Sequence, residues 1–134
     1  SWGGGLVTVS AANDRDSVIE IPATVKYQGV SYRVDELEDS AFAVHPFLKR
    51  VVMPDNPKLH VMKHVFDGSP NLESIYFRSK TPPRLGNAIW RVTMDDIFET
   101  PSFGKIVLYV PKGSKDAYCR SPWGHFTYIV EFEK

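Results

Sequence analysis

The sequence of 134 residues contains one cysteine, Cys119, and has no net charge at pH 7, with 16 basic and 16 acidic residues. A single cysteine excludes an internal disulfide and a thiolate cluster for zinc or iron–sulfur. The balanced charge removes the electrostatic basis for strong binding to nucleic acid or an anionic membrane. The longest apolar run, residues 106–110, is far shorter than the roughly 20 residues that span a bilayer. We therefore expect one domain with no cofactor, no nucleic-acid partner and no transmembrane segment.

Apolar residues recur at one common spacing in the middle of the chain. Five pairs of apolar residues are each 24 positions apart: Leu37 and Val61, Phe42 and Phe66, Leu48 and Leu72, Val51 and Ile75, and Met53 and Phe77. A period of 24 lies inside the range of roughly 20–29 residues that is typical of leucine-rich repeats. The spacing predicts short parallel strands that stack in register.

Two further segments match the strand part of this unit at longer spacings. Residues 19–22 match residues 51–54 at an offset of 32, and residues 106–108 match residues 75–77 at an offset of 31. The offset of 32 is longer than 24 because of residues 26–33, in which β-forming residues alternate around Gln28-Gly29 and predict an inserted β-hairpin. The offset of 31 is longer than 24 because of residues 82–103, where a Pro-Pro pair and a polar stretch predict a long loop with a short helical turn.

The two ends differ from the repeats. Ser114 is placed to cap a short helix over residues 115–120, and Pro122 ends that helix. A dense aromatic segment then follows, as expected for the cap of a stacked array. We predict a single domain over 1–134, with an N-terminal tail and cap strand at 1–17, repeats at 18–111 and a C-terminal cap at 112–134.

Residues 34–54 and 71–77, together with Pro82-Pro83 and residues 108–114, resemble the BspA-like leucine-rich repeat proteins of Bacteroidetes surfaces. That family's pattern is V-x-x-I-x-x-x-A-F-x-x-x-x-x-L-x-x-V-x-I-P, and the similarity covers about residues 18–132. The resemblance implies a β-rich leucine-rich repeat solenoid from the end of a short array. It would hold about four parallel strands in one sheet, a β-hairpin insertion, short helical or irregular connections and a capped C-terminus. It also implies a secreted or cell-surface location and a role in adhesion; the residues themselves indicate no location.

Strand alternation predicts which side chains meet solvent. The inward set is Ile19, Ile21, Val51, Met53, Ile75, Phe77, Ile106 and Leu108. Three outward rows are predicted: Glu20, Val52, Tyr76 and Val107; Pro22, Pro54, Arg78 and Tyr109; and Val18, Arg50, Ser74 and Lys105. The resulting face has an apolar centre, Val52, Tyr76, Val107 and Tyr109, edged by Arg50, Arg78 and Lys105. Aromatic and Arg side chains are enriched at interface anchors, so this face is the predicted binding surface. The alternative is that these residues are strand formers chosen for propensity.

Candidates for chemistry are weak. His60 and His64 have the i, i+4 spacing of a zinc pair on a helix, but no third ligand accompanies them. Asp95-Asp96 are adjacent acids in a polar loop, where solvation is the usual role. Cys119 lies outside any nucleophile motif, and we expect it to be a small buried apolar residue. We predict no catalytic residue and no metal site.

These observations favour a non-enzymatic interaction module, extracellular or on the cell surface, that binds a protein or glycan through the sheet face. Three alternatives remain. One is a structural spacer of an envelope protein, and another is a small hydrolase that uses acids of the 82–103 loop. The third is a β-sandwich carbohydrate module, which requires antiparallel pairing of the strands at Ile19 and Val51.

Overall fold

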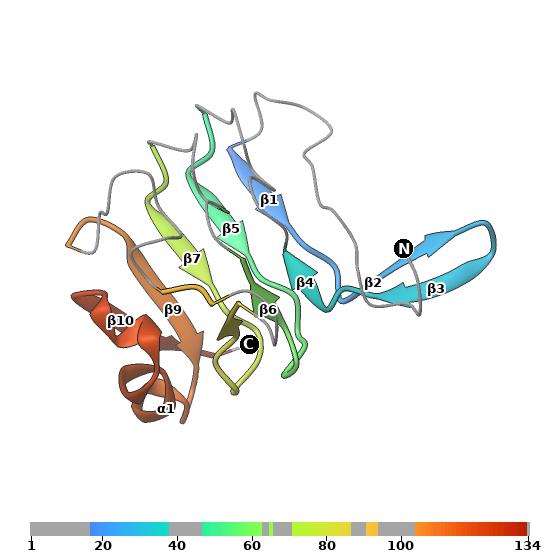
Figure 1. Ribbon diagram of the computed structural model, residues 1–134. Coiled ribbons are helices and arrows are strands. Elements are labelled where there is room, and N and C mark those ends of the chain that lie inside the picture. Colours follow the sequence, from blue (N-terminus) through green and yellow to red (C-terminus); the bar gives the residue numbers. More distant parts are fainter. Residues whose placement is uncertain are drawn as a thin grey trace.

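Parallel strands dominate the protein in a computed structural model, which describes residues 17–37, 47–62, 65, 71–86, 91–93 and 104–133. The larger sheet has the order β1-β5-β7-β9-β10, and all four pairings are parallel. Its strands are β1 (Val18–Glu20), β5 (Arg50–Val52), β7 (Ser74–Tyr76), β9 (Val107–Pro111) and β10 (Tyr128–Phe132). Figure 1 shows them side by side across the molecule. Parallel pairing of β1 with β5 excludes the β-sandwich alternative.

The register confirms two of the three predicted spacings and corrects the third. Val51 pairs with Ile19 on one side and with Ile75 on the other, at the expected offsets of 32 and 24. Ile75, however, pairs with Leu108, so the offset is 108−75, or 33, and the predicted 31 is wrong. The error of two residues keeps every side chain on the same face. The apolar pattern therefore does not distinguish the two registers.

The strand inventory is larger than the prediction of about four strands in one sheet. β10 adds a fifth strand, in a segment that was expected to be only an aromatic cap. A second parallel sheet has the order β4-β6-β8, and its strands are β4 (Glu36–Leu37), β6 (His60–Val61) and β8 (Arg84–Leu85). The predicted irregular connections, including part of the 82–103 loop, thus contain strands. A strand of two residues is too short to show an alternating pattern.

A β-hairpin projects to one side of the sheets, as predicted (Figure 1). β2 (Thr24–Tyr27) pairs antiparallel with β3 (Val30–Arg33). The two turn residues both have positive φ, 51° at Gln28 and 77° at Gly29. Such a two-residue turn matches the twist of the flanking strands, and glycine adopts positive φ without a steric penalty.

The C-terminal helix has the predicted bounds but a different cap. α1 covers Lys115–Arg120 and is followed by a 3-10 turn, η2 (Pro122–His125). The Ser114 hydroxyl does not cap α1; it donates to the Pro111 carbonyl at 2.5 Å. Instead the Glu131 carboxylate accepts from the backbone N–H of Gly113 at 2.9 Å and of Lys115 at 3.1 Å. The group that satisfies the first turn comes from β10 rather than from the adjacent sequence.

One hydrophobic cluster joins the two sheets. The eight side chains that we expected to point inward, from Ile19 to Leu108, are all buried, at 8% exposure or less. They pack in one core with residues of the smaller sheet such as Leu37 and Val61. β-branched side chains suit these positions because they pack well on a pleated surface. Phe42 and Phe66, which share the 24-residue spacing, lie outside the described residues, as do residues 1–16 of the predicted N-terminal tail and cap strand.

A buried asparagine organises the turn between β5 and β6. The Asn56 amide donates to the Val34 carbonyl at 2.8 Å and to the Asp35 carboxylate at 2.6 Å. Its side-chain oxygen accepts from the Lys58 N–H at 2.9 Å. Because its amide and carbonyl are both satisfied, Asn56 can be buried without the cost of an unpaired polar group.

Candidate functional site

The outward side chains of the five-stranded sheet form one continuous face. In each strand they alternate with the core residues, so every second residue belongs to the face. The parallel register aligns them in rows across the sheet, with the members Val18, Glu20, Arg50, Val52, Ser74, Tyr76, Val107, Tyr109, Tyr128, Val130 and Phe132. All are half-buried or exposed. We call this surface the sheet face.

A stack of one arginine and two tyrosines crosses the centre of the sheet face. Tyr76 and Tyr109 are register partners, and their rings stack with centroids 4.3 Å apart and an interplanar angle of 10°. From the opposite side, the guanidinium carbon of Arg50 lies 4.9 Å from the centroid of the Tyr76 ring. Neighbouring strands of a sheet lie about 4.8 Å apart, which places aligned rings in contact. We call these three residues the Arg–Tyr stack.

Both faces of the Tyr76 ring are occupied. β5 and β9 flank β7, so Arg50 covers one face of the ring and Tyr109 covers the other. The Phe132 ring meets Tyr76 in a T-shaped contact with centroids 5.3 Å apart. Each contact restricts the ring, so the stack offers a rigid group whose conformational entropy is already lost.

Arg78 forms the edge of the stack through an ion pair. Its guanidinium donates to the Glu20 carboxylate, which lies on β1, so the pair spans β5. The two side chains are 37% and 60% exposed. An ion pair with this exposure contributes little to stability, about 0–1 kcal/mol. The ion pair instead fixes the positions of two charged side chains, Glu20 on β1 and Arg78 after β7.

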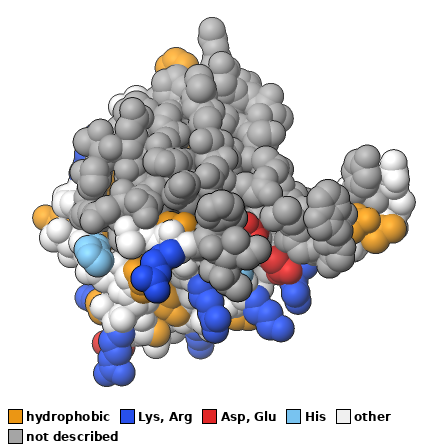
Figure 2. Space-filling model, viewed as in Figure 1, with side chains coloured by type: hydrophobic (Ala, Val, Ile, Leu, Met, Phe, Trp, Pro, Cys, Tyr) orange, Lys and Arg blue, Asp and Glu red, His pale blue; other side chains and the backbone are white. Residues whose placement is uncertain are grey.

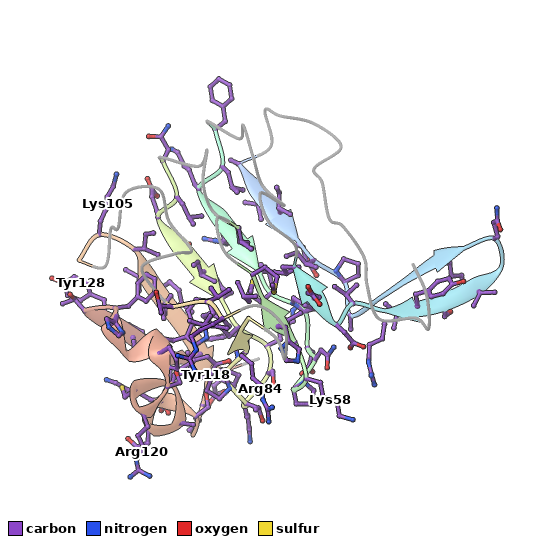
Figure 3. The ribbon with its side chains drawn as sticks, viewed as in Figure 1. Lys58, Arg84, Lys105, Tyr118, Arg120 and Tyr128 are labelled. Carbon is purple, nitrogen blue, oxygen red and sulfur yellow. The ribbon has the colours of Figure 1, made fainter. Side chains whose placement is uncertain are left out.

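The structure brings together five of the seven predicted site residues and corrects the position of two. Arg50, Val52, Tyr76 and Tyr109 lie at the centre of the sheet face, although Tyr109 rather than Val107 is the partner of Tyr76. Arg78 follows β7 and joins this face through its ion pair with Glu20. Val107 pairs with Ser74, one row away. Lys105 precedes β9 in an exposed turn, away from the row in which it was expected (Figure 3). Both corrections follow from the two-residue error in register.

Sequence reasoning missed the contribution of β10. Tyr128 and Val130 are 54% and 45% exposed on the sheet face, and Phe132 contacts the stack. Tyr128 pairs with Val107, an offset of 21 that does not fit the 24-residue pattern. The alternation of Tyr128, Val130 and Phe132 around the buried Ile129 is the signal that identifies this strand.

The other chemical candidates do not assemble into a site in the described part of the chain. His60 lies in β6, where its Nδ1 is 2.6 Å from the Gly86 carbonyl oxygen; His64 lies outside the described residues. Cys119 is exposed, so its predicted burial is wrong. The six-residue α1 buries only Tyr118, and the next residue points away from the core. Among described residues, no three of His, Cys, Asp or Glu are placed to hold a metal. The acids Asp95 and Asp96 lie outside the described residues.

Tyr118 and Asp35 have shifted pKa values and form structural contacts away from the sheet face. Burial raises the pKa of Tyr118, and the Asp55 charge adds to this effect. At Asp35, burial raises the pKa, but hydrogen bonds from Arg33 and Asn56 outweigh it and leave the pKa of the carboxyl below its usual value. Arg33 donates to Asp35 at 2.6 Å. Tyr118 donates to the Ser79 carbonyl, and Asp35 accepts from Arg33 and Asn56, so structural contacts account for both environments.

Comparison with known proteins adds no assignment. No protein-family model matches the chain, and a search of curated proteins gave no match. Within the described residues, the helices lack the length and apolar character needed to cross a membrane.

Proposed function

We propose that the protein is a short BspA-like leucine-rich repeat domain. Three sets of strands support this family. Val51 with Ile75, Leu37 with Val61, and Val61 with Leu85 are register partners 24 residues apart, which is the repeat length of the sequence pattern. Three of the six parallel pairings in the two sheets thus advance by one repeat length, as is expected of a solenoid with insertions between some of its repeats. The proposal includes an extracellular or cell-surface location, for which the family resemblance is the support.

The proposed function is a non-enzymatic interaction module that binds a protein partner through the sheet face. The observation that carries it is the Arg–Tyr stack at the centre of that face. Tyr and Arg are the residues that most often dominate the energy of protein interfaces, and they do so where they are rigid and central. Val52 and Val107 supply apolar area beside the stack, and Arg78 with Glu20 supplies a polar rim.

A protein partner fits the stack better than a glycan. Sugars commonly pack on the open face of an aromatic ring, but both faces of the Tyr76 ring are covered by Arg50 and Tyr109. The ring edges and the tyrosine hydroxyl groups remain for contact, and these suit the hydrogen-bonding groups and side chains of a protein surface. Adhesion to a protein is therefore the preferred form of the proposal.

The test is a binding array of purified surface and extracellular-matrix proteins and of glycans, probed with the wild-type chain and two variants. Tyr76→Ala removes the centre of the stack, and we expect at least a tenfold loss of affinity, as is typical of a central anchor. Phe47→Ala is the matched control because Phe47 is an aromatic residue, 55% exposed, outside the sheet face. Binding that survives Tyr76→Ala overturns the assignment of the face. No binding to any protein on the array would favour the spacer alternative.

A further inference from the structure

A second surface with different chemistry lies where the smaller sheet meets the C-terminal helices. An open depression of about 550 Å³ separates β8 and the preceding prolines from α1 and η2. It is lined by Pro82, Pro83, Arg84, Leu85, Val92, Ala117, Arg120, Ser121 and Pro122. None of these belongs to the sheet face. We call this surface the proline depression.

The two walls of the proline depression are bonded to each other beneath it. The indole Nε1 of Trp123 donates to the Pro83 carbonyl at 2.9 Å, and the Tyr118 hydroxyl donates to the Ser79 carbonyl at 2.7 Å. Trp123 and Tyr118 are both fully buried. These bonds hold residues 79–83, which we call the proline segment, against α1 and η2. The depression is therefore preformed, which lowers the entropy cost of binding a ligand.

The described lining of the proline depression is charged with one sign. Its apolar members include the prolines, Leu85 and Val92, and the two charged residues among those described are both arginines. Arg84 comes from β8 and Arg120 from the end of α1, and both are exposed. None of the ion pairs between described residues involves either of them. The ligand that complements this lining has an apolar group between negative charges.

The positive character continues beyond the depression along one edge of the molecule. Figure 3 shows Lys58, Arg84 and Arg120 along the lower edge, each pointing away from the sheets. Figure 2 shows Lys and Arg side chains gathered along the same edge. The chain as a whole is neutral, so this concentration is a local feature. A cluster of like charge steers an oppositely charged partner toward the depression.

We propose that the proline depression binds an acidic segment of a protein partner, with an aliphatic side chain on the apolar floor and carboxylates on Arg84 and Arg120. Guanidinium groups recognise carboxylates through paired hydrogen bonds, so the interaction depends on orientation as well as on charge. A glycan is disfavoured because the described residues that line the depression include no aromatic ring. A nucleic acid is disfavoured because the prolines, Leu85 and Val92 that share the lining with the two arginines suit an aliphatic side chain rather than a phosphate.

The test is a fluorescence-anisotropy titration of the full chain with a labelled peptide, Asp-Glu-Leu-Pro-Glu-Asp, flanked by glycines. The control peptide, Asn-Gln-Leu-Pro-Gln-Asn, keeps the shape and removes the charge. We expect binding of the acidic peptide, binding weaker by about tenfold or more for the control peptide, and loss of affinity at high salt. Equal binding of the two peptides, or no binding of the acidic one at low salt, overturns the proposal.

A pair of charge-matched variants locates the site. Arg84→Glu with Arg120→Glu reverses both arginines of the depression, and we expect at least about a tenfold loss of acidic-peptide affinity. Lys26→Glu with Lys49→Glu makes the same change in net charge at two exposed residues outside the depression, and we expect little change. Circular dichroism melts confirm that both variants fold. If both pairs lose affinity equally, the binding is non-specific attraction and the proposal is wrong. If a sulfated oligosaccharide binds at the arginines and the peptide does not, the proposal is also wrong.

Discussion

The middle of the larger sheet and its C-terminal end are built differently. In the middle, β5 and β7 stack aliphatic residues in aligned rows with the edge strand β1, such as Ile19, Val51 and Ile75. At the C-terminal end, α1 and η2 lie between β9 and β10 in the sequence. Here the packing depends on a few individual contacts between aromatic rings. The Phe77 ring lies 4.9 Å from the Tyr118 ring and 5.0 Å from the Trp123 ring, centroid to centroid.

The difference shows how a stacked sheet ends. A middle strand covers the apolar row of each neighbour, so its contacts recur and each is modest. A terminal strand has a neighbour on one side only, and bulky residues must fill the remaining space. Here Trp123 and Tyr118 fill it, and each also donates a hydrogen bond to the proline segment. We therefore expect single substitutions to cost more at the C-terminal end than in the middle.

The largest effect is expected for Trp123→Ala at the C-terminal end. The substitution removes a fully buried ring and leaves the Pro83 carbonyl without its donor. Such a truncation costs about 3–5 kcal/mol of unfolding free energy. Urea denaturation followed by far-UV circular dichroism measures the change. A loss below about 1 kcal/mol would contradict the structural role assigned to this ring.

The next largest effect tests the close approach between η2 and α1. A Cβ added at Gly124 would lie 2.2 Å from the Cys119 carbonyl oxygen, a backbone atom that cannot rotate away. Gly124→Ala therefore forces the two helices apart, at a cost of about 1–3 kcal/mol. The matched control is Gly104→Ala, whose Cβ would be 3.8 Å from the Thr127 hydroxyl oxygen. Thermal melts of the two variants should differ clearly, and equal stability would contradict the packing.

Tyr118→Phe tests the hydrogen bond to Ser79 and the effect of pH. Loss of the hydroxyl leaves the Ser79 carbonyl unpaired, at about 1–3 kcal/mol. Because burial raises the pKa of folded Tyr118, its contribution to stability is complete below the pKa of an unfolded tyrosine, about 10. Above that pH the unfolded state releases the proton first, and stability falls by up to about 1.4 kcal/mol per pH unit.

The pH dependence is measured by urea denaturation from pH 8 to pH 11. The wild type should lose stability above pH 10 more steeply than Tyr118→Phe, which lacks the group. Parallel curves for the two proteins would show that Tyr118 ionises as easily in the folded state as in the unfolded state.

The smallest effect is expected in the middle of the sheet. Ile75→Val removes one methyl group from a fully buried position between Val51 and Leu108. The expected cost is about 0.5–1.5 kcal/mol. Equilibrium unfolding in urea measures it. A cost as large as that of Trp123→Ala would remove the distinction between the two regions.

Periodicity predicted the middle of the molecule well because it is a local property of the chain. The pairing of Val51 with Ile75, the hairpin at Gln28-Gly29 and the bounds of α1 follow from spacing, turn residues and a proline stop. The two-residue strands of the smaller sheet carry too little pattern to be recognised. The predicted position of Val107 was wrong because a register shift of two residues preserves the alternation of inward and outward side chains.

The candidate site divides in the same way. Alternation alone placed Arg50, Val52, Tyr76, Arg78 and Tyr109 on one face. It did not indicate that Arg50 and Tyr109 would cover the two faces of one ring, because that depends on the register between strands. The proline depression was not foreseen, since its walls come from segments about 40 residues apart and meet through Trp123 and Tyr118.

The sequence by itself thus determined the parallel strands, their inward and outward sides and most of the residues on the exposed face, because these depend on spacing within a single segment. The tertiary structure decided the register at β9, the fifth strand, the capping of α1 by Glu131 and the surface between β8 and the C-terminal helices. These features depend on contacts between distant segments. Such contacts are selected by packing and hydrogen bonding in the folded state. The alternation at β10 indicates a strand, but it does not specify the pairing with β9.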